Sequence, residues 1–147
     1  MTCANLRRVA VILLLALTAA TSGAADKQSL ESLKQQAEEA KEAHQVDLLL
    51  KVAERQLDST KDFYNAGDDE HARAALKDVV EYSTRAGKVA VETGKKLKNA
   101  EIRIRKISER LQDIQRDLNV DERPPVKSAV ETLEKTRTDL LTRMFKK

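Results

Sequence analysis

Apolar residues recur every three or four positions along most of the chain, which is the spacing of one face of an α-helix. The pattern covers residues 30–60, 76–118 and 126–144, and charges interrupt it only at Glu101 and Arg137. No run of alternating apolar and polar residues bounded by turn residues predicts a strand. The repeat is close to a heptad, so it predicts an all-α fold in which helices pack along narrow seams, as in a coiled coil.

Two segments have the residues of turns. The first contains Gly67, which suits a left-handed helix cap, followed by Asp68, which suits the start of the next helix. The second ends in two prolines, the latter being Pro125, and proline is favoured in the first turn of a helix. The sequence therefore predicts three helices, at about residues 27–65, 69–118 and 125–145.

Reversal at both turns brings the apolar stripes into register. The expected antiparallel neighbours include Leu57 with Leu76, Leu30 with Ile104, Val126 with Leu118, and Leu140 with Ile104. We therefore expect an elongated antiparallel three-helix bundle whose first two helices form a coiled-coil-like hairpin.

Two glycines leave an alternative to this arrangement. Gly87 and Gly94 lie inside the second predicted helix, where each costs about 1 kcal/mol relative to alanine. A break near Gly94 would give a four-helix bundle. The apolar spacing continues through both glycines, however, and this favours one long helix whose glycines let another helix approach closely.

Charge is distributed unevenly between the first two predicted helices. Residues 26–70 contain 6 basic and 12 acidic side chains, whereas residues 85–110 contain 9 basic and 3 acidic ones. Antiparallel packing places much of the acidic segment beside the basic one. Each surface ion pair is worth only about 0–1 kcal/mol, but the asymmetry disfavours other pairings.

Residues 1–25 differ from the rest of the chain. Two arginines precede an apolar run of 12 residues, 9–20, and small residues follow it, which is the pattern of a secretory signal peptide. We expect its removal to leave one helical domain, 26–147, in the periplasm or outside the cell. The apolar run is shorter than the roughly 20 residues that cross a bilayer, so we do not expect an integral membrane protein after cleavage. Cleavage also removes Cys3, the only cysteine, and with it any means of forming disulfides.

The elongated hairpin would leave part of its length without a third helix. The segments around residues 46–57 and 76–94 carry apolar residues on more than one face, and a solvated two-helix arm should not expose so many. We therefore expect a homo-oligomer, or association with another protein, through Val46, Leu49, Leu50, Val79, Tyr82, Val89 and Val91. A break at Gly94 that folds the arm back would bury the same residues internally.

No motif of known catalytic or cofactor chemistry is present in the sequence. The histidines, His44 and His71, do not form Glu-x-x-His or His-Glu-x-x-His motifs, and there is no calcium loop or glycine-rich phosphate loop. The acidic run before His71 has the residue types of metal ligands, but it falls at a helix start, where acids complement the positive helix end. We expect neither an enzyme nor a bound cofactor or metal.

A basic stretch at residues 95–110 offers a second kind of interaction. Its candidate contacts for a polyanion are Lys95, Lys96, Lys98, Arg103, Arg105 and Lys106. These residues either pair with the acidic first helix and with water, or bind anionic lipid head groups or a cell-wall polymer. Few aromatic residues are available to stack on bases, so we do not expect nucleic-acid binding.

Phe63, Gly67, Asp68, Ala72 and Leu76 resemble the turn and second-helix start of a tetratricopeptide repeat. The resemblance covers residues 63–82 and implies peptide or protein binding, although no second copy follows at the period of that repeat. The whole chain also resembles small exported all-helical proteins of bacteria, which implies no particular activity. The sequence as a whole predicts an exported helical interaction or scaffold protein that acts through apolar helix faces.

Overall fold

A computed structural model of the chain describes residues 22–146, and it describes side chains from Leu30 onward. All regular secondary structure in this part is helical, which confirms the all-α prediction. The elements are α1 (Ser22–Glu39), α2 (Glu42–Asn65), α3 (Asp69–Thr93), α4 (Leu97–Asp117), a short 3-10 helix η1 (Val120–Glu122), and α5 (Arg123–Phe145). Residues 1–21 of the predicted signal peptide lie outside the described residues.

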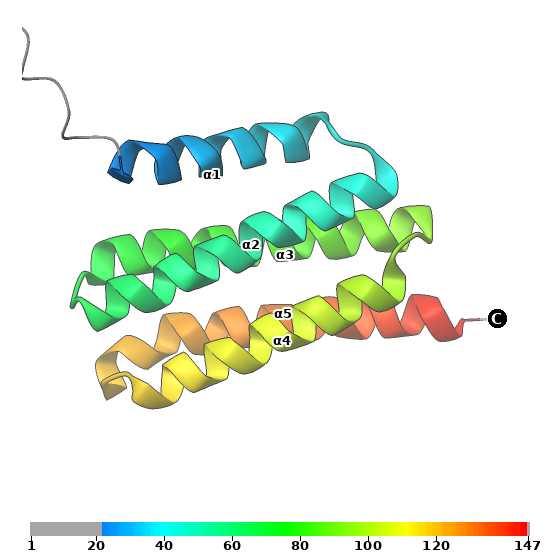
Figure 1. Cartoon of the computed structure of the whole chain (residues 1–147). Helices are drawn as coiled ribbons and strands as arrows, with labels where there is room; N and C mark the ends of the chain where they lie inside the picture. Colours follow the sequence, from blue (N-terminus) through cyan, green and yellow to red (C-terminus); the bar gives the residue numbers. More distant parts are fainter. Residues whose placement is uncertain (1–21, 147) are drawn as a thin grey trace, which may run out of the picture.

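The helices lie in three layers (Figure 1). α1 forms the first layer, α2 and α3 the second, and α4 and α5 the third. α1 contacts α2, and further contacts join α3 to α5 and α2 to α4. The helices α2 to α5 therefore enclose a common core, and α1 packs on the outside of the α2–α3 layer. Helices that follow one another are antiparallel, whereas α3 and α5 run in the same direction (Figure 1).

The first predicted turn is confirmed in detail. The backbone N–H of Asp68 donates to the carbonyl of Phe63 at 2.9 Å, and that of Gly67 donates to the carbonyl of Tyr64 at 3.1 Å. Gly67 has a φ of 72°, so this is the left-handed cap that glycine adopts without a steric penalty. The Asp68 carboxylate then accepts the backbone N–H of His71 at 3.2 Å and caps α3. α2 consequently ends, and α3 begins, where the sequence predicts.

The prediction of one long helix over residues 69–118 is wrong, because the chain reverses at Gly94–Lys96. Gly94 has a φ of 68° and donates its N–H to the carbonyl of Ala90 at 2.9 Å, which ends α3. Lys96 also adopts the left-handed conformation, with a φ of 60°, and α4 starts at the next residue. The break therefore occurs at the glycine that the alternative prediction named, and it folds α4 and α5 back along α2 and α3.

The first predicted helix is also interrupted, and nothing in its sequence indicates the break. Lys41 is extended, and Glu42 has a φ of 51°, so the chain turns sharply between α1 and α2. α1 folds back on α2 and lies on the opposite side of the α2–α3 layer from α4 (Figure 1). The predicted pairing of Leu30 with Ile104 is therefore wrong.

The core is built mainly from aliphatic side chains, and each of the helices α2 to α5 contributes to it. Its largest fully buried members are Leu49, Leu50, Leu57, Ile104, Ile107, Leu111, Leu133 and Leu140, with Val46, Val52, Val79 and Val126. Burying one such side chain contributes about 1.5–3 kcal/mol, so this cluster is the main source of stability in a chain with no disulfide among its described residues. Gly87 lies in the core where α3 and α5 approach closely, as expected of a small residue in a helix seam.

Ion pairs join the acidic α2 to the basic α4, but these helices run in the same direction, whereas the sequence predicted antiparallel packing of the acidic and basic segments. Arg103 donates to both carboxylate oxygens of Glu54, at 2.8 and 2.7 Å. Arg110 pairs with Asp58 at 2.6 Å further along the same two helices. The charge asymmetry thus selects which side of α4 faces α2.

Replacing Gly87 with alanine tests how tightly α3 and α5 pack. A Cβ at this position would overlap with the methyl carbon of Thr136, whose rotamer is held by a 3.0 Å hydrogen bond to the carbonyl of Thr132. We expect Gly87→Ala to lower the free energy of unfolding by about 1–3 kcal/mol, measured by urea denaturation.

Alanine is a better helix former than glycine, so without the close contact Gly87→Ala would raise the free energy of unfolding. Thr136→Ser removes the obstructing methyl group and should recover most of the loss when combined with Gly87→Ala. A single variant that is as stable as the wild type would contradict the close contact between the two helices.

Candidate functional site

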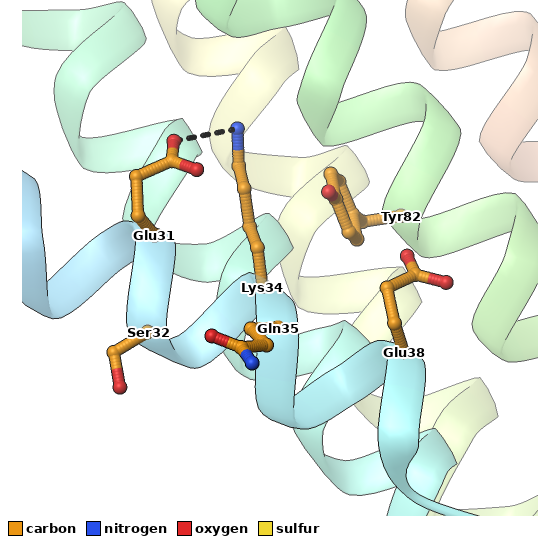
Figure 2. A pocket seen from close by; sticks show the side chains of 6 residues that line it. All are labelled: Glu31, Ser32, Lys34, Gln35, Glu38 and Tyr82. Carbon is orange, nitrogen blue, oxygen red and sulfur yellow. Dashed lines mark ion pairs between the residues drawn. The ribbon is translucent and has the colours of Figure 1, made fainter.

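The first hollow on the described surface lies where α1 meets α3. Figure 2 shows Lys34 of α1 between Glu31 of the same helix and Tyr82 of α3, with a dashed line for its ion pair with Glu31. The Lys34 ammonium lies 2.9 Å from the Asp78 carboxylate and 5.7 Å from the centre of the Tyr82 ring. Gln56 of α2 donates to the same carboxylate at 2.5 Å, so both α1 and α2 hold the Asp78 side chain.

A second ion pair closes the other end of this hollow. Arg85 of α3 donates to both oxygens of Glu38 at 2.6 and 2.7 Å, and its guanidinium lies 5.5 Å from the centre of the Tyr82 ring. These hydrogen bonds lower the pKa of the Glu38 carboxyl, and burial raises the pKa of the Tyr82 hydroxyl. Each charged group is thus neutralised by a partner of opposite sign, and Tyr82 remains protonated. The hollow is a joint that holds α1 on α3.

The second hollow is an apolar groove between α3 and the first half of α5, with a volume of about 400 Å³. We call it the α3–α5 groove. Its lining residues are Arg73, Leu76, Lys77, Val80 and Glu81 of α3, and Pro125, Ser128, Ala129 and Thr132 of α5. The floor is formed by Leu76 and Ala129, which are almost completely buried, while the half-buried Val80 and Pro125 form its walls. A solvent-exposed hollow with such a lining is a candidate binding surface.

Charges lie on only one rim of the α3–α5 groove. Arg73, Lys77 and Glu81 are four residues apart on α3, so they form one row along the helix surface. The opposite rim, from α5, offers only neutral side chains, among them Ser128 and Thr132. Among residues 30–146, whose side chains are described, no ion pair joins Arg73 or Lys77 to an acidic partner. These two cations are therefore available to a ligand.

The predicted association face lies inside the chain instead of on its surface. Val46, Leu49, Leu50 and Val79 are fully buried, Tyr82 is 8% exposed, and Val89 and Val91 are half-buried. These residues were expected to lie on a two-helix arm. The reversal at Gly94 and the packing of α1 cover both sides of α2 and α3 instead, so these residues do not form an exposed face.

Most of the predicted polyanion contacts already have acidic partners. The pairs are Lys95 with Glu42, Lys96 with Asp47, Arg103 with Glu54 and Asp47, and Arg105 with Glu101. Lys98 and Lys106 are exposed, and no ion pair connects either of them to another residue in the part with described side chains. The structure thus brings three of the six residues to α2, where they hold the bundle together.

The histidine near the first turn has a local role. The His71 ring lies 2.8 Å from the Asp68 carboxylate and 5.4 Å, between ring centres, from Phe63. Hydrogen bonds from the His71 ring and backbone lower the pKa of Asp68. No cluster of three potential metal ligands occurs within residues 22–146, and none of the helices in this range is both long and apolar enough to cross a membrane.

The α3–α5 groove was not predicted from the sequence, because the last predicted helix was expected to leave part of the first hairpin uncovered. α5 also packs along α3, and this second contact creates the hollow. Leu76 was expected to lie in the seam with Leu57 of the first predicted helix. The available signal was Arg73 and Lys77, two cations on the α3 face that carries Val80, away from that seam.

No protein-family profile, curated protein or solved structure matches this chain.

Replacing Arg85 tests the joint between α1 and α3. Arg85→Gln removes the charged donor, so the pKa of Glu38 should rise toward the ordinary range of a glutamate, as measured by NMR titration. A lowered pKa means that the pair stabilises the fold above the ordinary pKa of glutamate, and that this stabilisation disappears as the pH falls through the lowered pKa. The pair is exposed, so the stabilisation is about 1 kcal/mol or less. Lys88→Gln, elsewhere on α3, should leave Glu38 unchanged, and an unchanged Glu38 in Arg85→Gln would contradict the pairing.

Proposed function

We propose that this protein is an exported helical interaction protein that binds a helical segment of a partner in the α3–α5 groove. The observation that carries the proposal is a mostly apolar hollow whose rim holds two cations, Arg73 and Lys77, without ion-pair partners in the described part. Soluble proteins commonly bind amphipathic helices in grooves of this kind, with apolar anchors at helical spacing. The groove takes the place of the apolar face that the sequence predicts.

The charged row on α3 sets the chemistry of the partner and its direction. Arg73 and Lys77 lie toward the start of α3, and Glu81 lies one turn further along. A helix with an apolar stripe, acidic side chains at the end near Arg73, and a basic side chain near Glu81 would complement this rim. Charge complementarity of this kind contributes mainly to specificity and to the rate of association.

The alternative function, electrostatic binding of anionic lipid or wall polymer through residues 95–110, has weaker support. Lys95, Lys96 and Arg103 already pair with acids of α2, so binding a polyanion there would cost the bundle these contacts. Exposed Lys98 and Lys106 remain as two isolated cations.

Export of the protein rests on the pattern of residues 1–25. We expect the protein recovered from its producing cell to start at Ala25 or Asp26, shorter than the 16.5 kDa full chain and without Cys3. Intact-mass spectrometry and N-terminal sequencing of the purified protein measure both features. Recovery of the full-length chain carrying a reactive thiol would contradict export by this route.

Binding of designed peptides tests the α3–α5 groove directly. The probe is a fluorescent helical peptide with leucines at helical spacing and glutamates on one flank, and its control has lysines in place of the glutamates. Fluorescence anisotropy should show tighter binding of the acidic peptide. Val80→Asp should weaken this binding about tenfold or more, because it places a charge on the apolar wall.

Matched variants separate the groove from nonspecific adhesion. Val120→Asp makes the same change at an apolar residue that is 73% exposed and lies outside the groove, so it should leave binding unchanged. Arg73→Gln/Lys77→Gln should reduce the preference for the acidic peptide. Equal binding of both peptides, or equal loss in the two aspartate variants, would refute the proposed site.

A further inference from the structure

The turn between α1 and α2 forces an ordinary L-residue into an unfavourable backbone conformation. Only Ala40 and Lys41 separate the two helices. Lys41 is extended, and Glu42 has a φ of 51°, which lies in the left-handed region that favours glycine over residues with a Cβ. The turn therefore persists only because the contacts of α1 hold it in place.

The sequence of this turn favours a helix. Residues 39–43 read Glu-Ala-Lys-Glu-Ala, all strong helix formers, and neither glycine nor proline occurs between Ala24 and Ala66. The apolar spacing of three and four also continues through the turn, from Ala37 to Ala40 and Ala43. Local preference therefore points to one unbroken helix, whereas the folded chain bends it.

The contacts that oppose this preference are few. α1 buries Leu33 and Ala37, with Leu30 half-buried, against the α2–α3 layer. On α2 and α3 a second buried stripe lies toward α1: Leu49 and Val52 lie one turn from Gln45 and Gln56, and Tyr82 lies one turn from Asp78, which pairs with Lys34 of α1. If α1 and α2 joined into one helix, this stripe and the apolar side of α1 would both lose their cover.

Charges restrict what can restore that cover. Lys34 meets Asp78 at 2.9 Å, and Glu38 meets Arg85 at 2.6 Å, so the order of charges along α1 is opposite to that on α3. A chain segment that fits this face needs an apolar stripe together with a cation and, four residues later, an anion. α1 meets this requirement in the folded chain, through Lys34 and Glu38, and a second copy supplies the same segment.

We propose that the outer face of α2 and α3 is an interaction surface for α1 of a second copy of this chain. In the resulting dimer each chain straightens at Ala40–Glu42 into one helix and lays its α1 across the other chain's α2–α3 layer. Every contact of α1 is kept, between chains instead of within one, and the left-handed residue is lost from both chains. Exchange of this kind is favoured by short, strained hinges. The surface is separate from the α3–α5 groove, so this inference stands independently of the proposed function.

Two substitutions at one hinge residue test the role of the turn. Glu42→Gly and Glu42→Ala remove the same carboxylate, including its ion pair with Lys95. Only glycine is comfortable in the left-handed conformation, and only alanine favours the continuous helix. The full-length gene is expressed with each change, and the protein is purified as the cell delivers it, unfolded, and refolded at high concentration.

Light scattering should then show dimers for the wild type and a larger dimer fraction for Glu42→Ala. Glu42→Gly should lower the association constant at least about tenfold relative to Glu42→Ala. Wild-type protein that stays monomeric at millimolar concentration, or equal association of the two variants, would overturn the proposal.

Charge complementation between two chains identifies the exchanged segment. One chain carries Lys34→Glu and Glu38→Arg, and the other carries Asp78→Lys and Arg85→Glu, so each alone has like charges where α1 docks. When the two are refolded together, a dimer that exchanges α1 pairs opposite charges at both copies of the surface. Native mass spectrometry of chains with distinguishable masses should show mainly the mixed dimer, while a chain with all four changes should behave like the wild type.

The controls keep this experiment interpretable if a variant folds poorly. Circular dichroism of each chain reports its helix content, and the hinge variants give an answer that requires none of the charge reversals. Mixtures that contain only monomers, or the two kinds of chain in random pairs, would show that α1 is not the exchanged segment.

Discussion

The reversal at Gly94–Lys96 is the constraint on which the arrangement of the helices depends. The α2–α3 pair has a wide arc of apolar side chains around its surface, in which Leu50 and Leu57 are fully buried. The α4–α5 pair has a similar arc, which includes Leu111 and Leu133. Each pair alone would leave one side of its arc in water. Three residues suffice to fold one pair onto the other because Gly94 takes a left-handed conformation without steric cost. Lys96 adopts the same conformation at a penalty of roughly 1–2 kcal/mol, and burial of a single leucine offsets a penalty of that size.

The parts of the fold that were predictable from sequence are those that local chemistry determines. Gly67 and Asp68 end one helix and start another through hydrogen bonds within a few residues, so their side chains alone indicate the turn. At Gly94 the local signal was present, but the apolar spacing outweighed it. That spacing continues through a reversal when the helices on both sides face the same core, and it therefore cannot distinguish a bent chain from a straight one.

The break at Ala40–Lys41 has no signal of its own, because tertiary packing imposes it against local preference. The same limitation explains the error in the predicted association face. The apolar spacing predicts that Leu49 and Val79 are shielded from water, and both are fully buried in the structure. Which segment supplies the cover depends on where the chain turns. The α3–α5 groove was likewise hidden, since it exists only because α5 contacts two helices at once.

Charged residues between α4 and α5 determine the register of these two helices more than the stability of the fold. Arg137 binds Glu101 at 2.9 Å and Glu134 at 2.7 Å, and Ser108 donates to the same Glu134 at 2.6 Å. Partly buried ion pairs gain little net free energy, because removing the charges from water costs about as much as their attraction returns. A shift of α5 by one turn along α4 would separate Arg137 from Glu101 and Glu134 from Ser108, whereas the Arg137–Glu134 pair lies within α5 and would remain. Glu101 and Arg137 thus interrupt the apolar pattern at the two positions that meet across the helices.

The two sharp bends of the chain are fastened to each other. Lys95, in the bend between α3 and α4, pairs with Glu42 in the bend between α1 and α2, and Lys96 pairs with Asp47 at 3.0 Å just beyond it. All four side chains are at least one-third exposed, so dissolved ions reach them readily. At about 0.1 M ionic strength the screening length is roughly 10 Å, and it shortens as salt is added. Added salt therefore weakens the ion pairs that join the two bends. If one bend moves, the other loses the same contacts.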